Sequence, residues 1–191
     1  MSKIILAGIL GSIAMFIWTA IAHMALPLGE AGVRQLPDEA AFINAVGTTL
    51  ADHRGLYIFP GPDVAPNATS QEKKESMQRM KEKVEKGPSG ILMYHPNREF
   101  AFGKWLTVEY ITQLIEALLV VALLAQTRLM TFGGRVIFVT TAGILAAIAT
   151  NVSYWNWYGF PKRYIAAYIF IEIVGFFLVG IVAAFVLRRK T

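Results

Sequence analysis

The sequence predicts an all-α membrane protein with four transmembrane helices and a small extracytoplasmic α+β insertion between the first and second of them. Three observations support this fold class. Hydrophobic residues make up 55% of the chain, and the mean hydropathy is +0.48. Four apolar runs reach the roughly 20 residues that cross a bilayer core as a helix. One long polar stretch, residues 29–104, separates the first run from the other three.

The four apolar runs lie at about 4–26, 105–127, 135–158 and 162–187. The first contains Ala20-Ile21-Ala22, a small-x-small pattern of the kind found at signal-peptide cleavage sites, but it is long and only Lys3 precedes it. We therefore expect residues 1–28 to form an uncleaved signal anchor. Residues 105–191 are expected to form a bundle of three transmembrane helices joined by short loops.

Basic residues at the ends of the spans predict the orientation. Residues 29–104 contain as many acidic as basic residues. Cytoplasmic loops carry an excess of lysine and arginine, so both termini are expected to be cytoplasmic and residues 29–104 extracytoplasmic. The residues placed inside are Lys3, Arg128, Arg135, Arg188, Arg189 and Lys190, whereas Lys162 and Arg163 fall outside as an exception. No basic stripe with interleaved aromatic residues is present, which argues against a nucleic-acid partner.

The polar stretch contains signals for two helices and two strands. "LPDEAAFINAVGTTLADH" begins like a helix, with a proline and acidic residues. "TSQEKKESMQRMKEKVEKG" opens with a capping box of Thr69 and Glu72 and ends at Gly87. The runs "GLYIFPG" and "GILMYHP" are strand-like and are expected to pair as a minimal sheet.

The second of these helices carries two further patterns. Met77, Met80 and Val84 form a thin apolar stripe, for which packing is the favoured interpretation over a binding face. Ion pairs at i,i+4 are expected between Glu75 and Arg79 and between Glu82 and Lys86.

Small residues in the first and third spans predict close helix contacts, because they allow two backbones to approach. The small-xxx-small pairs are Ala7/Gly11, Gly8/Ser12, Ala142/Ala146 and Gly143/Ala147.

Polar residues inside the spans form the candidate site. Glu109, Gln113 and Glu116 share one face of the second span. With a rise of 1.5 Å per residue, Glu116 lies about 16 Å from the outer surface and Glu172 of the fourth span about 15 Å. Asn151 and His23 occupy the outer parts of the third and first spans.

A charge at the bilayer centre is costly, so such residues face the bundle interior or a cavity. No lysine or arginine shares the depth of Glu116 and Glu172, so these carboxyl groups should be protonated, share a proton, or hold a cation. Three interpretations stay open. In the first, the site is an outward-facing polar cavity for a proton, a cation or a polar headgroup. In the second, the polar groups only hydrogen-bond one helix to another. In the third, the carboxylates meet a basic residue of another subunit.

Aromatic residues gather at the expected outer surface, either as an interfacial girdle or as the lining of a pocket for a lipid or quinone-like headgroup. The candidate lining residues are Trp105, Tyr154, Trp155, Trp157, Tyr158, Tyr164 and Tyr168.

The sequence offers no support for catalysis or for a metal site. No HExxH, GxSxG, P-loop or GxGxxG motif occurs, and the chain has no cysteine. His23 alone could ligate a haem or zinc, but a lone histidine at a helix end is more often a hydrogen-bonded interface residue. The cofactor therefore stays open.

At "LPDEAAF", "GLYIFPG" and "NWYGFP" the sequence resembles small bacterial inner-membrane four-span proteins of unassigned function. The resemblance implies a bacterial cytoplasmic-membrane setting and brings no activity or catalytic residues.

The sequence thus favours a non-enzymatic integral membrane subunit or accessory protein of a larger complex. Its expected partners are membrane lipids and either another protein or further copies of itself. The alternative is a small transporter or channel that moves protons or cations past Glu109, Glu116 and Glu172.

Overall fold

The computed structural model describes residues 3–188, which divide into two compact units. The membrane unit comprises the described residues up to 34 and from 100 onward, and the insertion unit comprises residues 35–99. Arg189 and Lys190, which entered the orientation argument, lie outside the described residues. The described chain contains the helices α1 (Lys3–Met24), α2 (Glu39–Leu50), α3 (Ser70–Lys86), α4 (Phe102–Ala125), α5 (Phe132–Tyr158) and α6 (Lys162–Val186), and the strands β1 (Gly55–Phe59) and β2 (Gly90–Tyr94).

Four of these helices, α1, α4, α5 and α6, are long and apolar enough to cross a membrane. This confirms the prediction of a polytopic, mostly helical membrane protein with four spans. The predicted starts of the second and third spans were each three residues late. Helix α5 begins at Phe132 because the hydroxyl of Thr131 accepts a hydrogen bond from the backbone N–H of Gly134 at 3.1 Å and caps the first turn.

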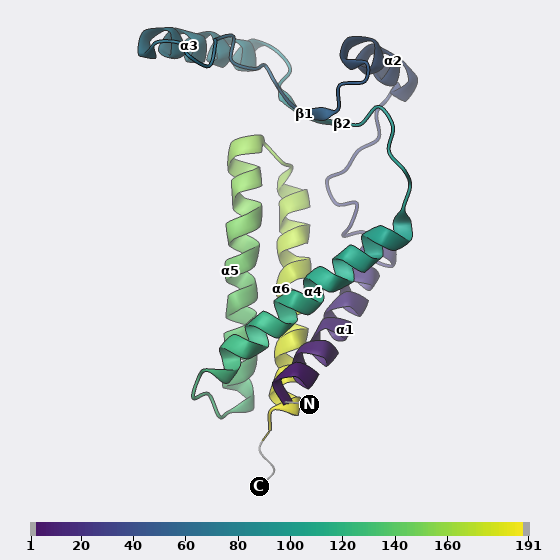
Figure 1. Cartoon of the computed structure of the whole chain (residues 1–191), viewed down its shortest axis with the longest axis vertical. Helices are drawn as coiled ribbons and strands as arrows, with labels where there is room; N and C mark the ends of the chain where they lie inside the picture. Colours follow the sequence, from purple (N-terminus) through teal and green to yellow (C-terminus); the bar gives the residue numbers. More distant parts are fainter. Residues whose placement is uncertain (1–2, 189–191) are drawn as a thin grey trace. The chain divides into compact units, whose positions relative to one another are not determined.

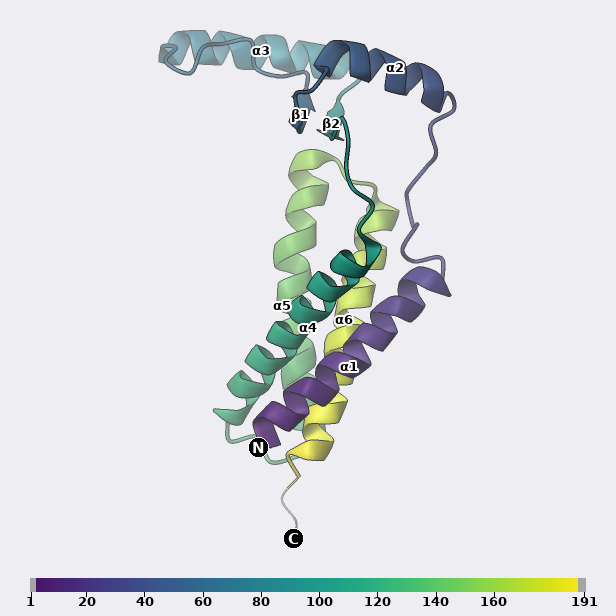
Figure 2. The same cartoon turned by 45° about the vertical axis from the view of Figure 1, so that its right-hand side comes forward.

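The membrane helices pack in the order α4–α1–α6–α5. Helix α6 contacts both α5 and α1 extensively, and α1 also contacts α4, whereas α4 makes few contacts with α5 or α6. Figure 1 shows α4 crossing the α5–α6 pair obliquely, so that α4 and α5 are close where the loop 126–131 joins them and diverge toward the other end. The turned view of Figure 2 shows α1 inclined in the same way along α6.

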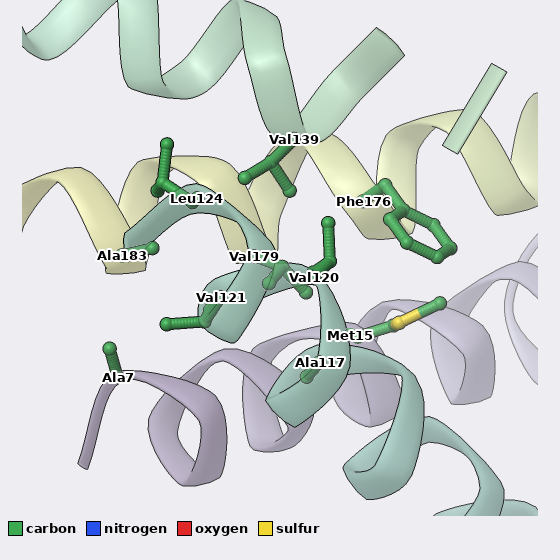
Figure 3. Close-up of a cluster of buried hydrophobic side chains, with 10 residues drawn as sticks. All are labelled: Ala7, Met15, Ala117, Val120, Val121, Leu124, Val139, Phe176, Val179 and Ala183. Atoms are coloured by element: carbon green, nitrogen blue, oxygen red, sulfur yellow. The ribbon is translucent and has the colours of Figure 1, made fainter. Parts of the chain in front are cut away.

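The apolar core lies where the four helices converge. Figure 3 shows its ten buried side chains, which come from all four membrane helices: Ala7, Met15, Ala117, Val120, Val121, Leu124, Val139, Phe176, Val179 and Ala183. In the predicted small-residue pairs Ala7/Gly11, Gly8/Ser12 and Gly143/Ala147, both members are buried. A Cβ atom at Gly11 would lie only 3.1 Å from a methyl group of Val179, so these positions permit the close approach that the pattern predicts.

Basic side chains gather at the same end of the membrane unit as this core. The Lys3 ammonium donates to the backbone carbonyl of Arg188 at 3.1 Å, which joins the start of α1 to the end of α6. The Arg188 guanidinium lies 4.3 Å from the ring centroid of Phe185, and Arg135 Nε donates to the Leu129 carbonyl in the α4–α5 loop.

The insertion unit has the two helices and the two-stranded sheet that the sequence predicts. Strands β1 and β2 are antiparallel, with Tyr57 opposite Leu92 in the middle of the register. Asp38 caps α2 by accepting from the backbone N–H of Ala41. The capping box of Thr69 and Glu72 is present at the start of α3 in both directions.

The expected ion pairs along α3 are not the ones that form. Instead of pairing with Glu75, Arg79 forms a salt bridge with Asp63 from the loop before the helix, and the i,i+4 salt bridge along α3 joins Lys81 and Glu85. The apolar stripe is packed only in part: Met77 is 62% exposed and Val84 is also exposed, whereas Met80 is half-buried.

Candidate functional site

Polar side chains from all four membrane helices meet at the level where α4 diverges from α5. Their direct contacts follow the packing order of the helices: α4 to α1 through Gln113 and Thr19, α1 to α6 through His23 and Tyr168, and α6 to α5 through Glu172 and Asn151. We call this set, together with Glu109 and Glu116, the polar cluster.

Gln113 is the centre of the α4 side of the cluster. Its side chain is only 4% exposed, and its Nε2 donates to Glu109 Oε1 at 2.8 Å and to Thr19 Oγ1 at 3.0 Å. The Thr19 hydroxyl in turn donates to the Met15 carbonyl at 3.1 Å. These donations fix the amide orientation, because a flipped amide would place Oε1 against the Glu109 carboxylate, which only accepts when ionised.

The other end of the same amide has no partner. Gln113 Oε1 is buried and accepts no hydrogen bond within the described residues. Buried polar groups in folded proteins are nearly always paired, so this oxygen is an acceptor that the described chain leaves without a donor.

Three carboxyl groups belong to the polar cluster, two from α4 and one from α6. Glu109 is exposed, whereas Glu116 and Glu172 are half-buried. Glu116 interacts electrostatically with both Glu109 and Glu172. Glu172 Oε2 accepts a long hydrogen bond of 3.4 Å from Asn151 Nδ2, which also donates to the Ala147 carbonyl at 3.0 Å. Glu116 of α4 and Glu172 of α6 therefore lie within range of each other's charge.

Helices α1 and α6 are joined through His23 and Trp18. His23 Nδ1 lies 2.9 Å from the Thr19 carbonyl oxygen, which can only accept, so Nδ1 is the donor in this contact. The His23 ring meets the Tyr168 ring edge-on at 5.8 Å between centroids. One turn deeper, Trp18 Nε1 donates to the Ile171 carbonyl at 2.9 Å.

The chain after α1 folds back over this end of the membrane unit. A Cβ atom at Gly29 would meet the His23 ring at 2.7 Å, and one at Gly32 would lie 2.9 Å from the backbone nitrogen of Tyr164. Gly32 also has a φ of 81°, a left-handed conformation that glycine adopts without a steric penalty. The segment 25–34 thus packs against His23, which stays exposed, and against the first turn of α6.

The predicted aromatic lining separates into two groups. Tyr164 and Tyr168 stack at 4.4 Å between centroids, and contacts through Phe160 continue from Tyr164 to Tyr154 and Tyr158. This aromatic row reaches the polar cluster at Tyr168. Three tryptophans lie apart from it. Trp157 is 78% exposed, Trp155 lies under the Lys162 ammonium at 6.0 Å, and Trp105 meets Phe100 at 5.2 Å.

No basic side chain neutralises the cluster in the described part of the chain. The salt bridges of residues 3–188 all lie in the insertion unit. Among the same residues, no group of three or more histidine, aspartate or glutamate side chains is arranged to hold a metal ion. The carboxylates are therefore near one another but do not converge on one point.

A second polar feature lies in the insertion unit, where a surface pocket of about 350 Å³ is bordered by Asp63, Glu72 and Arg79. Asp63 accepts from Ser76 Oγ at 3.0 Å and forms a two-pronged contact with Arg79. Hydrogen bonding to Arg79, and then to Ser76, holds the pKa of Asp63 well below its ordinary value of 3.8. The Asp63 carboxylate thus connects its loop to α3 through Arg79 and Ser76.

Sequence reasoning did not assign Thr19, Trp18 or Asp63 to these contacts. Thr19 lies four residues before His23, on the same face of α1, which is a usable signal. Trp18 and Asp63 act over long sequence distances, to Ile171 and Arg79, and no local pattern identifies such partners. Comparison of the chain with protein-family models, curated proteins and solved structures finds no match.

Proposed function

We propose that this protein is a non-enzymatic integral membrane subunit or accessory protein whose polar cluster binds a polar ligand within the outer half of the bundle. The observation that carries the proposal is the combination of a buried, partnerless Gln113 Oε1 with three neighbouring carboxyl groups that no basic side chain of the described chain balances. Burying these groups is costly unless a hydrogen-bond donor or a positive charge meets them, and the described chain supplies neither.

The distribution of polar and apolar contacts supports binding rather than passage. The ten-residue apolar core fills the convergent end of the four helices. The polar cluster lies nearer the other end of the helices, and α4 makes few contacts with α5 and α6 along its length. A ligand bound at the cluster would therefore meet close-packed apolar side chains toward the convergent end.

The proposed setting is the bacterial cytoplasmic membrane, with both termini cytoplasmic and residues 35–99 on the extracytoplasmic side. The basic residues Lys3, Arg135 and Arg188 support this orientation, because they gather at the end of the membrane unit that the positive-inside rule places in the cytoplasm. In this setting the insertion unit is the part of the chain best placed to meet a protein partner or a second copy of this chain.

Native mass spectrometry of the full chain, purified from its membrane in a mild detergent, tests the accessory role. We expect a co-purifying protein or a homo-oligomer, together with a retained small molecule or lipid. The proposal would be falsified by a lone monomer with nothing bound under conditions that preserve a known membrane complex.

The second candidate is a small proton or cation transporter, favoured by the presence of Glu116 within electrostatic range of both Glu109 and Glu172. It predicts proton or cation flux in proteoliposomes that is lost in Glu116→Gln/Glu172→Gln without loss of the folded bundle. Absence of flux in the unmodified chain removes this candidate and leaves the binding role intact.

A further inference from the structure

If the polar cluster is a binding site, as proposed above, its residues indicate the chemical class of the ligand. The polar cluster consists almost entirely of hydrogen-bond acceptors: the carboxyl groups of Glu109, Glu116 and Glu172, and the buried Oε1 of Gln113. The amide donors beside them are already engaged, Gln113 Nε2 by Glu109 and Thr19, and Asn151 Nδ2 by Ala147 and Glu172. The complement to this arrangement carries positive charge and several N–H or O–H donors.

The spacing of the acceptors distinguishes an organic cation from a bare metal ion. A metal ion needs its ligands to converge within coordination distance, and no three acidic or histidine side chains of the described residues do so. An ammonium group does not need three acidic or histidine ligands, because an amide oxygen and fewer carboxyl groups can accept its N–H donors.

The chain itself does not supply this group in its described part. Lys162, at the start of α6, lies over Trp155, and Lys3 is bonded to the far end of the bundle at Arg188. We therefore propose that the polar cluster binds a protonated primary amine from outside the chain, with Gln113 Oε1 and the carboxyl groups of Glu116 and Glu172 accepting its N–H groups. Two sources offer this chemistry: the ethanolamine headgroup of a lipid, and a free primary amine.

The sharpest test uses the unmodified full chain and a lipid series that differs only in the number of N–H donors. The chain is reconstituted in nanodiscs with phosphatidylethanolamine or its monomethyl, dimethyl and trimethyl (phosphatidylcholine) forms, all with the same acyl chains. Native mass spectrometry then measures the lipid that the released chain retains. Because each methylation removes one N–H donor, we expect affinity to fall stepwise, by about tenfold or more from ethanolamine to choline.

A variant on α4 tests the residue that carries the inference. Gln113→Leu removes the partnerless acceptor and is expected to weaken amine retention about tenfold. Gln126→Leu is the matched control, since Gln126 caps the opposite end of the same helix and, within residues 3–188, its side-chain amide hydrogen-bonds only to the Ala122 carbonyl. If Gln113→Leu fails to fold, the methylation series on the unmodified chain still decides.

A competition arm separates the two sources. Free ethanolamine that displaces phosphatidylethanolamine, or that binds without lipid in calorimetry, supports a free amine; retention of the lipid without displacement supports the headgroup. Equal retention of ethanolamine and choline lipids, with no binding of free ethanolamine, would overturn the proposal that the cluster binds a primary amine. If the unmodified chain retains a different molecule that Gln113→Leu loses, the amine proposal is overturned but the proposed binding role stands. If the chain retains nothing at all, both proposals are wrong.

Discussion

Gly143 on α5 provides the most direct test of how the membrane helices pack. Gly143 is buried, and a Cβ atom built there would lie 2.6 Å from Cγ and 3.0 Å from Cδ2 of Phe176 on α6. Carbon atoms in contact are normally about 3.5–4.0 Å apart. The substitution Gly143→Ala therefore requires α5 and α6 to separate by about 1 Å, or Phe176 to leave its rotamer.

Overpacking of this kind typically costs about 1–3 kcal/mol. Replacing glycine by alanine also favours the helix by up to about 1 kcal/mol, and a control must remove that contribution. Gly133→Ala is suitable, because Gly133 lies in the same helix and a Cβ atom there meets nothing within 4 Å. The difference between the two variants then reports mainly the packing cost.

The assay is thermal unfolding in detergent, followed by tryptophan fluorescence. All four tryptophans, Trp18, Trp105, Trp155 and Trp157, lie in the membrane unit, so the signal reports the bundle alone. For a chain of this size, 1 kcal/mol corresponds to about 2–4 °C in Tm, so Gly143→Ala should melt roughly 2–12 °C below Gly133→Ala. Adding Phe176→Leu to Gly143→Ala should recover part of the loss. Equal melting of the two glycine variants would refute the close contact of α5 and α6 at this position.

Three further outcomes are expected. Because the pKa of Asp63 is lowered in the folded state, its contribution is present above the ordinary value of 3.8 and is lost progressively as the pH falls below it; the protection of the α3 amides, measured as exchange relative to the intrinsic rate at the same pH, should fall below pH 3.8, and Asp63→Asn should lower it at neutral pH. Thr69→Ala should fray the first turn of α3 by about 1 kcal/mol, seen as faster exchange of its first amides while those of α2 are unchanged. Glu116→Leu removes a carboxyl group from the bundle and should raise Tm while abolishing ligand retention; a lower Tm with retention intact would show that Glu116 is structural.

The elements of this fold could be predicted because their signals are local. Hydropathy over about 20 residues marks each span, and the capping box of Thr69 and Glu72 marks the start of α3. The start of α5 was missed by three residues because the Thr131 cap lies outside the strongly apolar run. The two strands were predictable from short apolar runs bounded by glycine and proline.

The order in which the helices pack could not be predicted in the same way. In lipid, a face that meets another helix and a face that meets acyl chains are both apolar, so composition does not distinguish them. The exposed Ile137 and the buried Val139 lie two positions apart on α5 with nearly the same side-chain chemistry. The depth of Glu116 and Glu172 follows from helix rise alone, whereas the hydrogen bond from Gln113 to Thr19 depends on α1 packing against α4.

Glu116 distinguishes a binding site from interhelical hydrogen bonding. Interhelical bonding accounts for Gln113 with Thr19, and for Asn151 with Glu172, because each pair is satisfied across two helices. It does not account for Glu116, which within the described residues forms no hydrogen bond or ion pair and interacts with two other carboxyl groups. A residue that only joined helices would have a partner. A carboxyl group at this depth without a partner among the described residues therefore supports the proposed binding role over a purely structural one.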